Sequence, residues 1–136
     1  MIRLTDLLKE LQEPYKTFFN KEQQYFIKQP SFDDYVKEIG AILPKNDKPS
    51  TWLFNHHAAE IAWEEGKSSD AKKHIEIAMK NNTVGNSITF VLDFIINNRG
   101  TKEQLQQGIE SKIKDSQEKE TAMKLLNDPK YGGKLK

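Results

Sequence analysis

Apolar residues recur three or four positions apart along most of the chain, which is the spacing of helices that bury one face. The first stripe of such residues consists of Leu4, Leu7, Leu8, Leu11, Tyr15, Phe18, Phe19 and Phe26. Pro14 interrupts this stripe and predicts either a kink or the start of a second helix. Pro30 ends the stripe, and Ser31 then predicts an N-cap for a helix with apolar residues over 35–39. An N-terminal helical hairpin is therefore expected over residues 1–43.

A loop over residues 44–50 separates this hairpin from further helices, because it holds two prolines and several turn-forming residues but no apolar one. Ser50 or Thr51 is the expected N-cap of the next helix, which ends at Gly66 because glycine readily adopts the C-terminal turn. The later helices are expected over residues 70–81, 87–98 and 117–127, with a fourth that begins at the capping box of Thr101 and Gln104.

The helical stripes cover most of the chain, and no stretch alternates apolar and polar residues over more than a few positions, as a half-buried strand does. We therefore expect an all-α fold, a compact bundle of seven or eight helices in a single domain over residues 1–136. After the N-terminal hairpin, the domain divides into helical pairs over 51–114 and a C-terminal capping helix over 117–127. Residues 128–136 have no apolar period and predict a flexible, frayed tail.

Composition narrows the class of protein. The 136 residues are enough for one domain with its own core, and the absence of cysteine excludes disulfides and thiolate metal sites. Lysine and arginine total 21 against 20 acidic residues, so no net field attracts nucleic acid. The longest apolar run, over residues 90–96, is far shorter than the roughly 20 residues of a membrane span. We expect a soluble cytoplasmic protein without a nucleic-acid or membrane partner.

Gly66 and Gly100 stand 34 residues apart, and each closes an apolar helix just before another begins. Around the first glycine, three small residues and one bulky residue occupy the positions where two helices would cross: Ala59, Ala71, Ala78 and Ile75. The segment over residues 55–82 thereby resembles one unit of the tetratricopeptide-repeat family. Residues 86–114 resemble a degenerate second unit, in which the alanines are replaced by Asp93, Leu105 and Lys112. Any antiparallel helical hairpin also favours alanines at its crossing and glycine at its turn, so generic packing explains the same pattern.

The resemblance implies that the first helix of each unit lines a concave face that binds a partner. The residues that it places on this face are His56, Glu60, Trp63, Glu64, Phe90, Phe94 and Asn97. The set mixes aromatic side chains with two carboxylates and lacks the basic cluster that would clamp a C-terminal carboxylate. A basic or apolar peptide is therefore the expected partner. The alternative is that Trp63, Phe90 and Phe94 are core residues, as aromatic residues at helical spacing usually are.

His56, His57 and Glu60 form a His-His-x-x-Glu run, in which His56 and Glu60 share one helical face at a spacing compatible with a metal ion. His74 on the next helix is a candidate third ligand. The chain has only three histidines and no His-Glu-x-x-His motif. It also has no Gly-rich phosphate loop, no Gly-x-Ser-x-Gly elbow and no cysteine nucleophile. The sequence therefore favours a protein without enzymatic activity, cofactor or metal.

The leading hypothesis is a small non-catalytic module, an adaptor or an inhibitor or immunity-type protein, that holds a partner protein or peptide on a groove between its central helices. Two alternatives stay open. A metal-dependent enzyme would be centred on His56, Glu60 and His74. A homodimeric structural bundle would use the apolar helix over residues 87–98 as its seam.

Overall fold

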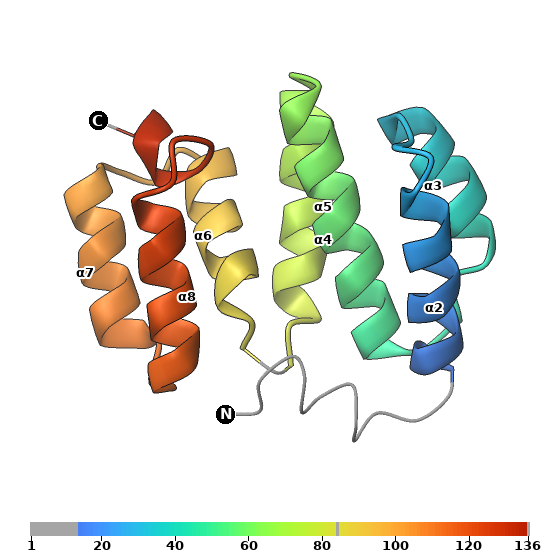
Figure 1. Cartoon of the computed structure of the whole chain (residues 1–136), viewed down its shortest axis with the longest axis horizontal. Coiled ribbons are helices and arrows are strands. Elements are labelled where there is room, and N and C mark those ends of the chain that lie inside the picture. Colours follow the sequence, from blue (N-terminus) through green and yellow to red (C-terminus); the bar gives the residue numbers. More distant parts are fainter. Residues whose placement is uncertain (1–13, 84, 136) are drawn as a thin grey trace.

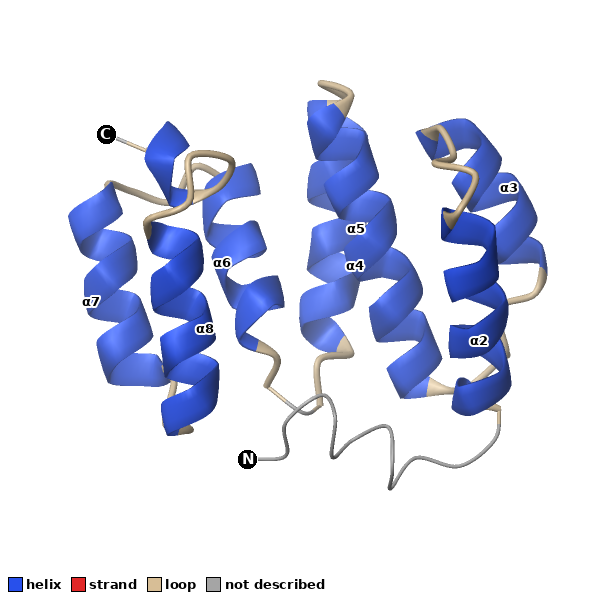
Figure 2. Cartoon of the chain, viewed as in Figure 1, coloured by secondary structure: helices blue, strands red, loops and turns tan. Residues whose placement is uncertain are grey.

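All regular secondary structure is helical in the part of the chain that the computed structural model describes, residues 14–83 and 85–135. Its elements are α2 (Tyr15–Phe26), α3 (Phe32–Ala41), α4 (Lys48–Glu64), α5 (Ser68–Lys80), α6 (Ser87–Ile96), α7 (Lys102–Lys112), α8 (Ser116–Leu126) and the 3-10 helix η1 (Gly132–Lys134). They stand side by side, with α2 and α3 at one end, α4 and α5 in the middle, and α6 to α8 at the other end (Figures 1 and 2). The expected all-α class is confirmed, with seven α-helices in these ranges. Residues 4–11, which carry the first part of the apolar stripe, lie outside the described residues.

Polar side chains fix where the helices begin. Ser31 and Thr101 cap α3 and α7 as expected, each accepting a hydrogen bond from the backbone N–H three residues further on. The start of α4 differs from the expected one. Asp47 is its N-cap, ahead of Ser50, because Pro49 fits the first helical turn, where a missing N–H costs no hydrogen bond.

The helices α4 and α5 form a closely packed antiparallel hairpin. Gly66 makes the turn between them in the left-handed conformation, with φ of +78°. Ala59, Ala71 and Ala78 are fully buried, and so is Ile75. Methyl-sized side chains allow the two backbones to approach each other, so the expected burial of these three alanines is confirmed.

The helices α6 and α7 do not repeat this arrangement. Helix α8 packs against both of them, while the backbones of α6 and α7 stay further apart than those of α4 and α5. The rings of Phe90 and Phe94 lie against Gly108 and Gly100, and Leu105 is buried in place of an alanine. These bulky side chains keep the second pair of helices from packing as the first pair does.

Two clusters of buried side chains stabilise the fold, one among α2 to α5 together with Leu92 and Ile96 of α6, and one among α6 to α8. Trp63 at the end of α4 and Tyr131 pack against both clusters. Tyr131 belongs to residues 128–135, called here the 128–135 segment, which contains η1 and the buried Gly132. This packing differs from the expected frayed tail, because α8 and α4, the latter distant in sequence, together supply the surface on which the segment lies.

Candidate functional site

The predicted groove residues of α4 have two different environments. Glu60 and Trp63 are half-buried and Glu64 is exposed. Their spacing places all three on one side of the second half of α4, over residues 60–64. His56, one turn earlier on the same side, is only 6% exposed. The structure therefore brings three of these residues together on one side of α4, near the surface of the protein, and places the fourth in the interior.

The groove residues predicted on α6 and directly after it are not part of this surface. Phe90 and Phe94 are half-buried among the side chains of α6 to α8. Asn97 donates a hydrogen bond from Nδ2 to Asp93 Oδ1 at 2.9 Å, and Asp93 also accepts from Arg99 Nε at 3.0 Å. These residues have structural partners of their own, so the candidate site is confined to α4 and its neighbours.

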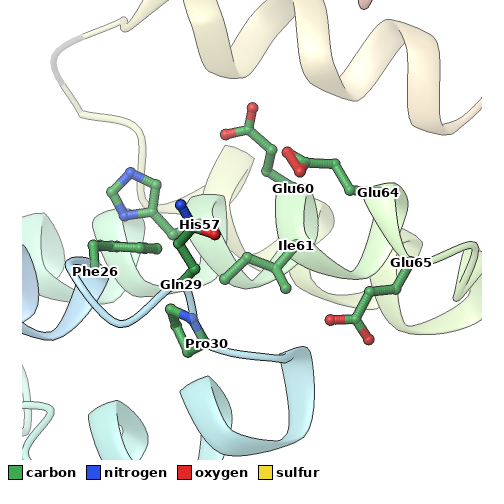
Figure 3. A pocket seen from close by; sticks show the side chains of 8 residues that line it. All are labelled: Phe26, Gln29, Pro30, His57, Glu60, Ile61, Glu64 and Glu65. Carbon is green, nitrogen blue, oxygen red and sulfur yellow. The ribbon is translucent and has the colours of Figure 1, made fainter.

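A cavity of about 360 Å³ lies beside the second half of α4 (Figure 3). Acidic and apolar side chains line it together: Phe26, Gln29, Pro30, His57, Glu60, Ile61, Glu64 and Glu65. Glu60, Ile61 and Glu64 project from α4, and Phe26 and Pro30 come from α2 and its connection to α3 (Figure 3). The cavity thus presents carboxylates at the edge of an apolar surface, which suits a ligand that combines positive charge with hydrocarbon.

The three carboxylates of this cavity are not equivalent. Glu65 Oε2 accepts a hydrogen bond from the backbone N–H of Phe32 at 2.7 Å, at the positive N-terminal end of α3. That contact ties Glu65 to the fold. Glu60 and Glu64 instead have partners in the 128–135 segment, described below, and they carry the negative charge that a ligand would meet.

One wall of the cavity rests on a buried acidic residue. Glu22 is fully buried, and its Oε2 accepts a hydrogen bond from the Tyr35 hydroxyl. The same oxygen lies 3.0 Å from His57 Nδ1, close enough for an ion pair with a protonated imidazole but without the alignment of a hydrogen bond. The ring of Phe26 meets His57 edge to face, with centroids 5.0 Å apart. Glu22 and Phe26 of α2 thus hold His57 in place at the cavity, and Tyr35 of α3 fixes Glu22.

Side chains of the 128–135 segment cover the adjoining part of α4. The Tyr131 hydroxyl donates to Glu60 Oε2 at 2.6 Å, and its ring stacks on Trp63 with centroids 5.8 Å apart. Lys130 Nζ lies 2.9 Å from Glu64 Oε1 and 3.6 Å from Glu60 Oε2. Lys134 Nζ lies 4.4 Å from the centroid of the Trp63 ring, a cation–π distance.

These contacts determine the ionisation states of Glu60 and Tyr131. Burial by itself would raise the pKa of Glu60, but the hydrogen bond from Tyr131 and the electrostatic interactions with His56, Lys130 and His57 bring it below its usual value. Burial and the Glu60 carboxylate together raise the pKa of Tyr131 to about 12. At neutral pH an ionised Glu60 therefore faces a protonated phenol and a positively charged Lys130.

His56 belongs to a buried polar network, which corrects its expected place on the groove. Trp52 Nε1 donates to Thr89 Oγ1 at 2.9 Å, and Thr89 Oγ1 lies 2.9 Å from His56 Nδ1. Burial, assisted by His57, lowers the pKa of His56 to about 3. The imidazole is therefore neutral, and its Nδ1 can accept the threonine proton. His56 joins α4 to α6 rather than facing a partner.

The histidines and glutamate considered as metal ligands are not gathered around one point. His74 Nδ1 lies 2.8 Å from Asn55 Oδ1, and its ring meets Phe32 and Phe54 edge to face. Within residues 14–83 and 85–135, no group of three or more histidine, aspartate or glutamate side chains is placed to hold a metal ion. The arrangement of His56, Glu60 and His74 that the enzyme alternative needs is therefore absent from these ranges.

Sequence reasoning missed several residues of the site: Glu22, Phe26, His57, Lys130, Tyr131 and Lys134. Glu22 left a readable signal, because it lies four residues from Phe18 and four from Phe26 on an otherwise apolar stripe. Tyr131, the one aromatic residue among the lysines of the last nine residues, was a weaker signal. Nothing local indicates that Tyr131 meets Glu60, 71 residues earlier.

Comparison of the chain with protein-family models, with curated proteins and with solved structures gave no significant match. Among the described helices, none combines the length and the apolar character needed to cross a membrane. The site's geometry is therefore the basis for its functional interpretation.

Proposed function

We propose that this protein is a non-catalytic binding module that holds a segment of a partner protein on the second half of α4. The observation that carries the proposal is that Glu60, Trp63 and Glu64 already contact a lysine- and tyrosine-bearing segment of the same chain. A surface that fits such a segment in cis has the shape and charge to fit a similar one from another protein.

The chemistry of the surface favours a peptide that is bound over a substrate that is chemically converted. Trp63 offers an aromatic face, and aromatic residues that are part apolar and part polar are typical anchors at protein interfaces. Glu60 and Glu64 add charges that select a basic residue beside the anchor. The cavity next to them supplies apolar lining from Phe26 and Ile61. Binding by these groups requires no bond to be made or broken.

The scaffold is consistent with this role. Helices α4 and α5 form a rigid hairpin with small residues at the crossing, as a tetratricopeptide-like unit would. A rigid helix presents its side chains at fixed spacing, so binding a partner segment requires little reorganisation of the receptor and loses little entropy. We interpret the protein as an adaptor or an inhibitor or immunity-type protein, which acts by occupying its partner.

Affinity capture with a matched pair of variants tests the proposal. The double variant Trp63→Ala and Glu64→Ala removes the aromatic anchor and one carboxylate, whereas Lys72→Ala and Lys73→Ala changes two exposed residues of α5. We expect a stoichiometric partner from the native lysate to bind the wild type and the lysine variant but not the Trp63 and Glu64 variant, with circular dichroism unchanged in all three. Equal capture by both variants would remove this face from consideration.

A further inference from the structure

The 128–135 segment makes two kinds of contact. Gly132 packs closely on Leu126 of α8, and Leu135 packs against the cluster among α6 to α8, whereas the contacts with α4 come from side chains. The turn of the segment is formed by its own backbone, in which Tyr131 and Gly133 donate to Asp128 O at 3.0 and 2.9 Å. Only the side chains of Lys130, Tyr131 and Lys134 make the contacts with α4 described above. The segment therefore meets α4 as a ligand would, through one aromatic ring and two ammonium groups.

We infer that the second half of α4 is a receptor for a partner segment with an aromatic residue directly preceded by a lysine, and that residues 130–134 occupy this receptor until the partner segment displaces them. This inference rests on the proposed function and names the chemistry of its ligand. It also assigns a role to the 128–135 segment, as a resident competitor for the site.

The contacts of the resident segment are suited to exchange. The side chains of Lys130 and Glu64 are 45% and 47% exposed, so water competes for both members of this ion pair. Lys134 is exposed as well. Tyr131 alone is held by both a hydrogen bond and a stacked ring, and it is the contact that a competitor must replace.

The neighbouring cavity explains how a partner segment can gain over the resident one. Glu60 and Glu64 line the cavity and also contact Lys130, so the two sites are continuous. Lys130, Tyr131 and Lys134 do not line the cavity. A partner segment that extends beyond its lysine can place a second basic side chain there, with its hydrocarbon part against Phe26 and Ile61.

Gly132 provides a way to release the segment without altering the groups that bind. A Cβ built at Gly132 would lie 1.9 Å from Leu126 O, so alanine at this position forces the turn away from α8. The neighbouring Gly133 is a matched control, because a Cβ there would meet Asp128 O at 3.2 Å, a contact that a small shift relieves. Tyr131→Ala is a second release variant that leaves the turn unchanged.

The probe is a synthetic peptide with the sequence of residues 128–136, added to full-length protein labelled with ¹⁵N. The chain has two tryptophans, so two indole N–H signals report on Trp63 and on the buried Trp52. We expect the Trp63 signal to move in Gly132→Ala and in Tyr131→Ala, and to return toward its wild-type position as the peptide binds. If the resident segment is docked nine-tenths of the time, the release variants bind the peptide about 10-fold more tightly than the wild type or Gly133→Ala.

Four results would overturn the inference. The first is equal peptide affinity in the wild type and both release variants. The second is the absence of peptide binding in a variant whose Trp63 signal has moved, and the third is equal binding of a peptide that carries Tyr131→Ala. The fourth is a dimer of the wild type or a release variant in light scattering, which would assign the site to the same segment of a second copy.

The outcomes also separate this inference from the proposed function. If capture of a partner depends on Trp63 and Glu64 but the peptide does not bind, the binding face stands and the lysine-aromatic ligand is wrong. If neither the partner nor the peptide depends on Trp63 and Glu64, both proposals fail.

Discussion

One face of α4 runs through both halves of the helix, but its two halves lie in different surroundings. In the first half, five consecutive residues from Trp52 to His56 are all buried, as are Ala58 and Ala59. In the second half, over residues 60–64, only Ala62 is buried. Helix α6 covers His56 on this face, whereas one turn later the 128–135 segment covers Glu60.

This difference separates polar groups that specify the fold from polar groups that can exchange partners. His56 and Asn55 are buried and have fixed partners on neighbouring helices, so removing a partner leaves a desolvated group without a hydrogen bond. The carboxylates of Glu60 and Glu64 keep 20% and 47% of their side-chain surface exposed. Water can replace their partners, and so can another protein. Stability should therefore depend on the first half and binding on the second.

The largest expected effect comes from a cavity in the first half. Leu53 is 4% exposed, and Leu53→Ala should lower the free energy of unfolding by about 3 kcal/mol, because transfer and cavity terms add. The matched change in the second half is Ile61→Ala, which removes a partly exposed side chain and should lower it by about 1 kcal/mol. Urea denaturation of both variants measures the difference. Equal losses would contradict the contrast between the two halves.

Acid should also weaken the first half through His56. The folded protein keeps this imidazole neutral down to a pKa of about 3, whereas the unfolded chain binds its proton near pH 6.5. Below pH 6.5 the unfolded state therefore binds more protons, and stability falls with falling pH by up to about 1.4 kcal/mol per pH unit from this residue.

The variant His56→Gln isolates this contribution, because an amide oxygen can accept from Thr89 and does not titrate. His74, whose pKa burial also lowers, remains in the variant as a smaller source of acid sensitivity. We expect the pH dependence of the unfolding free energy between pH 6.5 and 4.5 to be shallower in His56→Gln than in the wild type. Parallel curves would show that His56 takes up its proton as readily in the folded state as in the unfolded one.

The first half of α4 and its hairpin with α5 could be predicted because their signals are local. Gly66 marks the turn, and alanines at helical spacing mark the crossing, so both could be read from about 25 residues of sequence. The burial of His56 could not be read in this way. His56 and Glu60 occupy one helical face, and the contact that links the first of them to α6 comes from Thr89, 33 residues away.

The second half of α4 was recognised as a candidate surface but not as an occupied one. Glu60, Trp63 and Glu64 were assigned to a binding face through a family resemblance, and the same reasoning placed Phe90 and Phe94 beside them. The rings of these phenylalanines lie instead against Gly108 and Gly100, because these glycines leave room for bulky side chains between α6 and α7. The contact of Tyr131 with α4 depends on the path of the whole chain, which local periodicity does not reveal.

A smaller effect should follow from Tyr131→Phe, which keeps the ring on Trp63 and removes the hydroxyl that donates to Glu60. Loss of this partly buried, charge-assisted hydrogen bond should lower the free energy of unfolding by about 1 kcal/mol. The pKa of Glu60 should rise, because the hydrogen bond from Tyr131 is the main cause that lowers it against burial. Carbon-13 NMR of the Glu60 carboxyl measures this shift, and an unchanged pKa would mean that the segment does not lie on α4 in solution.

The smallest effect is expected at the ion pair of Lys130 and Glu64, and its size determines whether the segment can exchange. A double-mutant cycle with Lys130→Ala and Glu64→Ala should give a coupling of at most about 1 kcal/mol, since both side chains are nearly half exposed. The coupling should shrink in 1 M salt, where the screening length falls to about 3 Å. A coupling of several kcal/mol that salt leaves unchanged would mark the segment as a permanent part of the fold. A weak, screened coupling leaves Tyr131 as the main contact to replace, so a partner with an aromatic residue and one more basic side chain has enough to displace it.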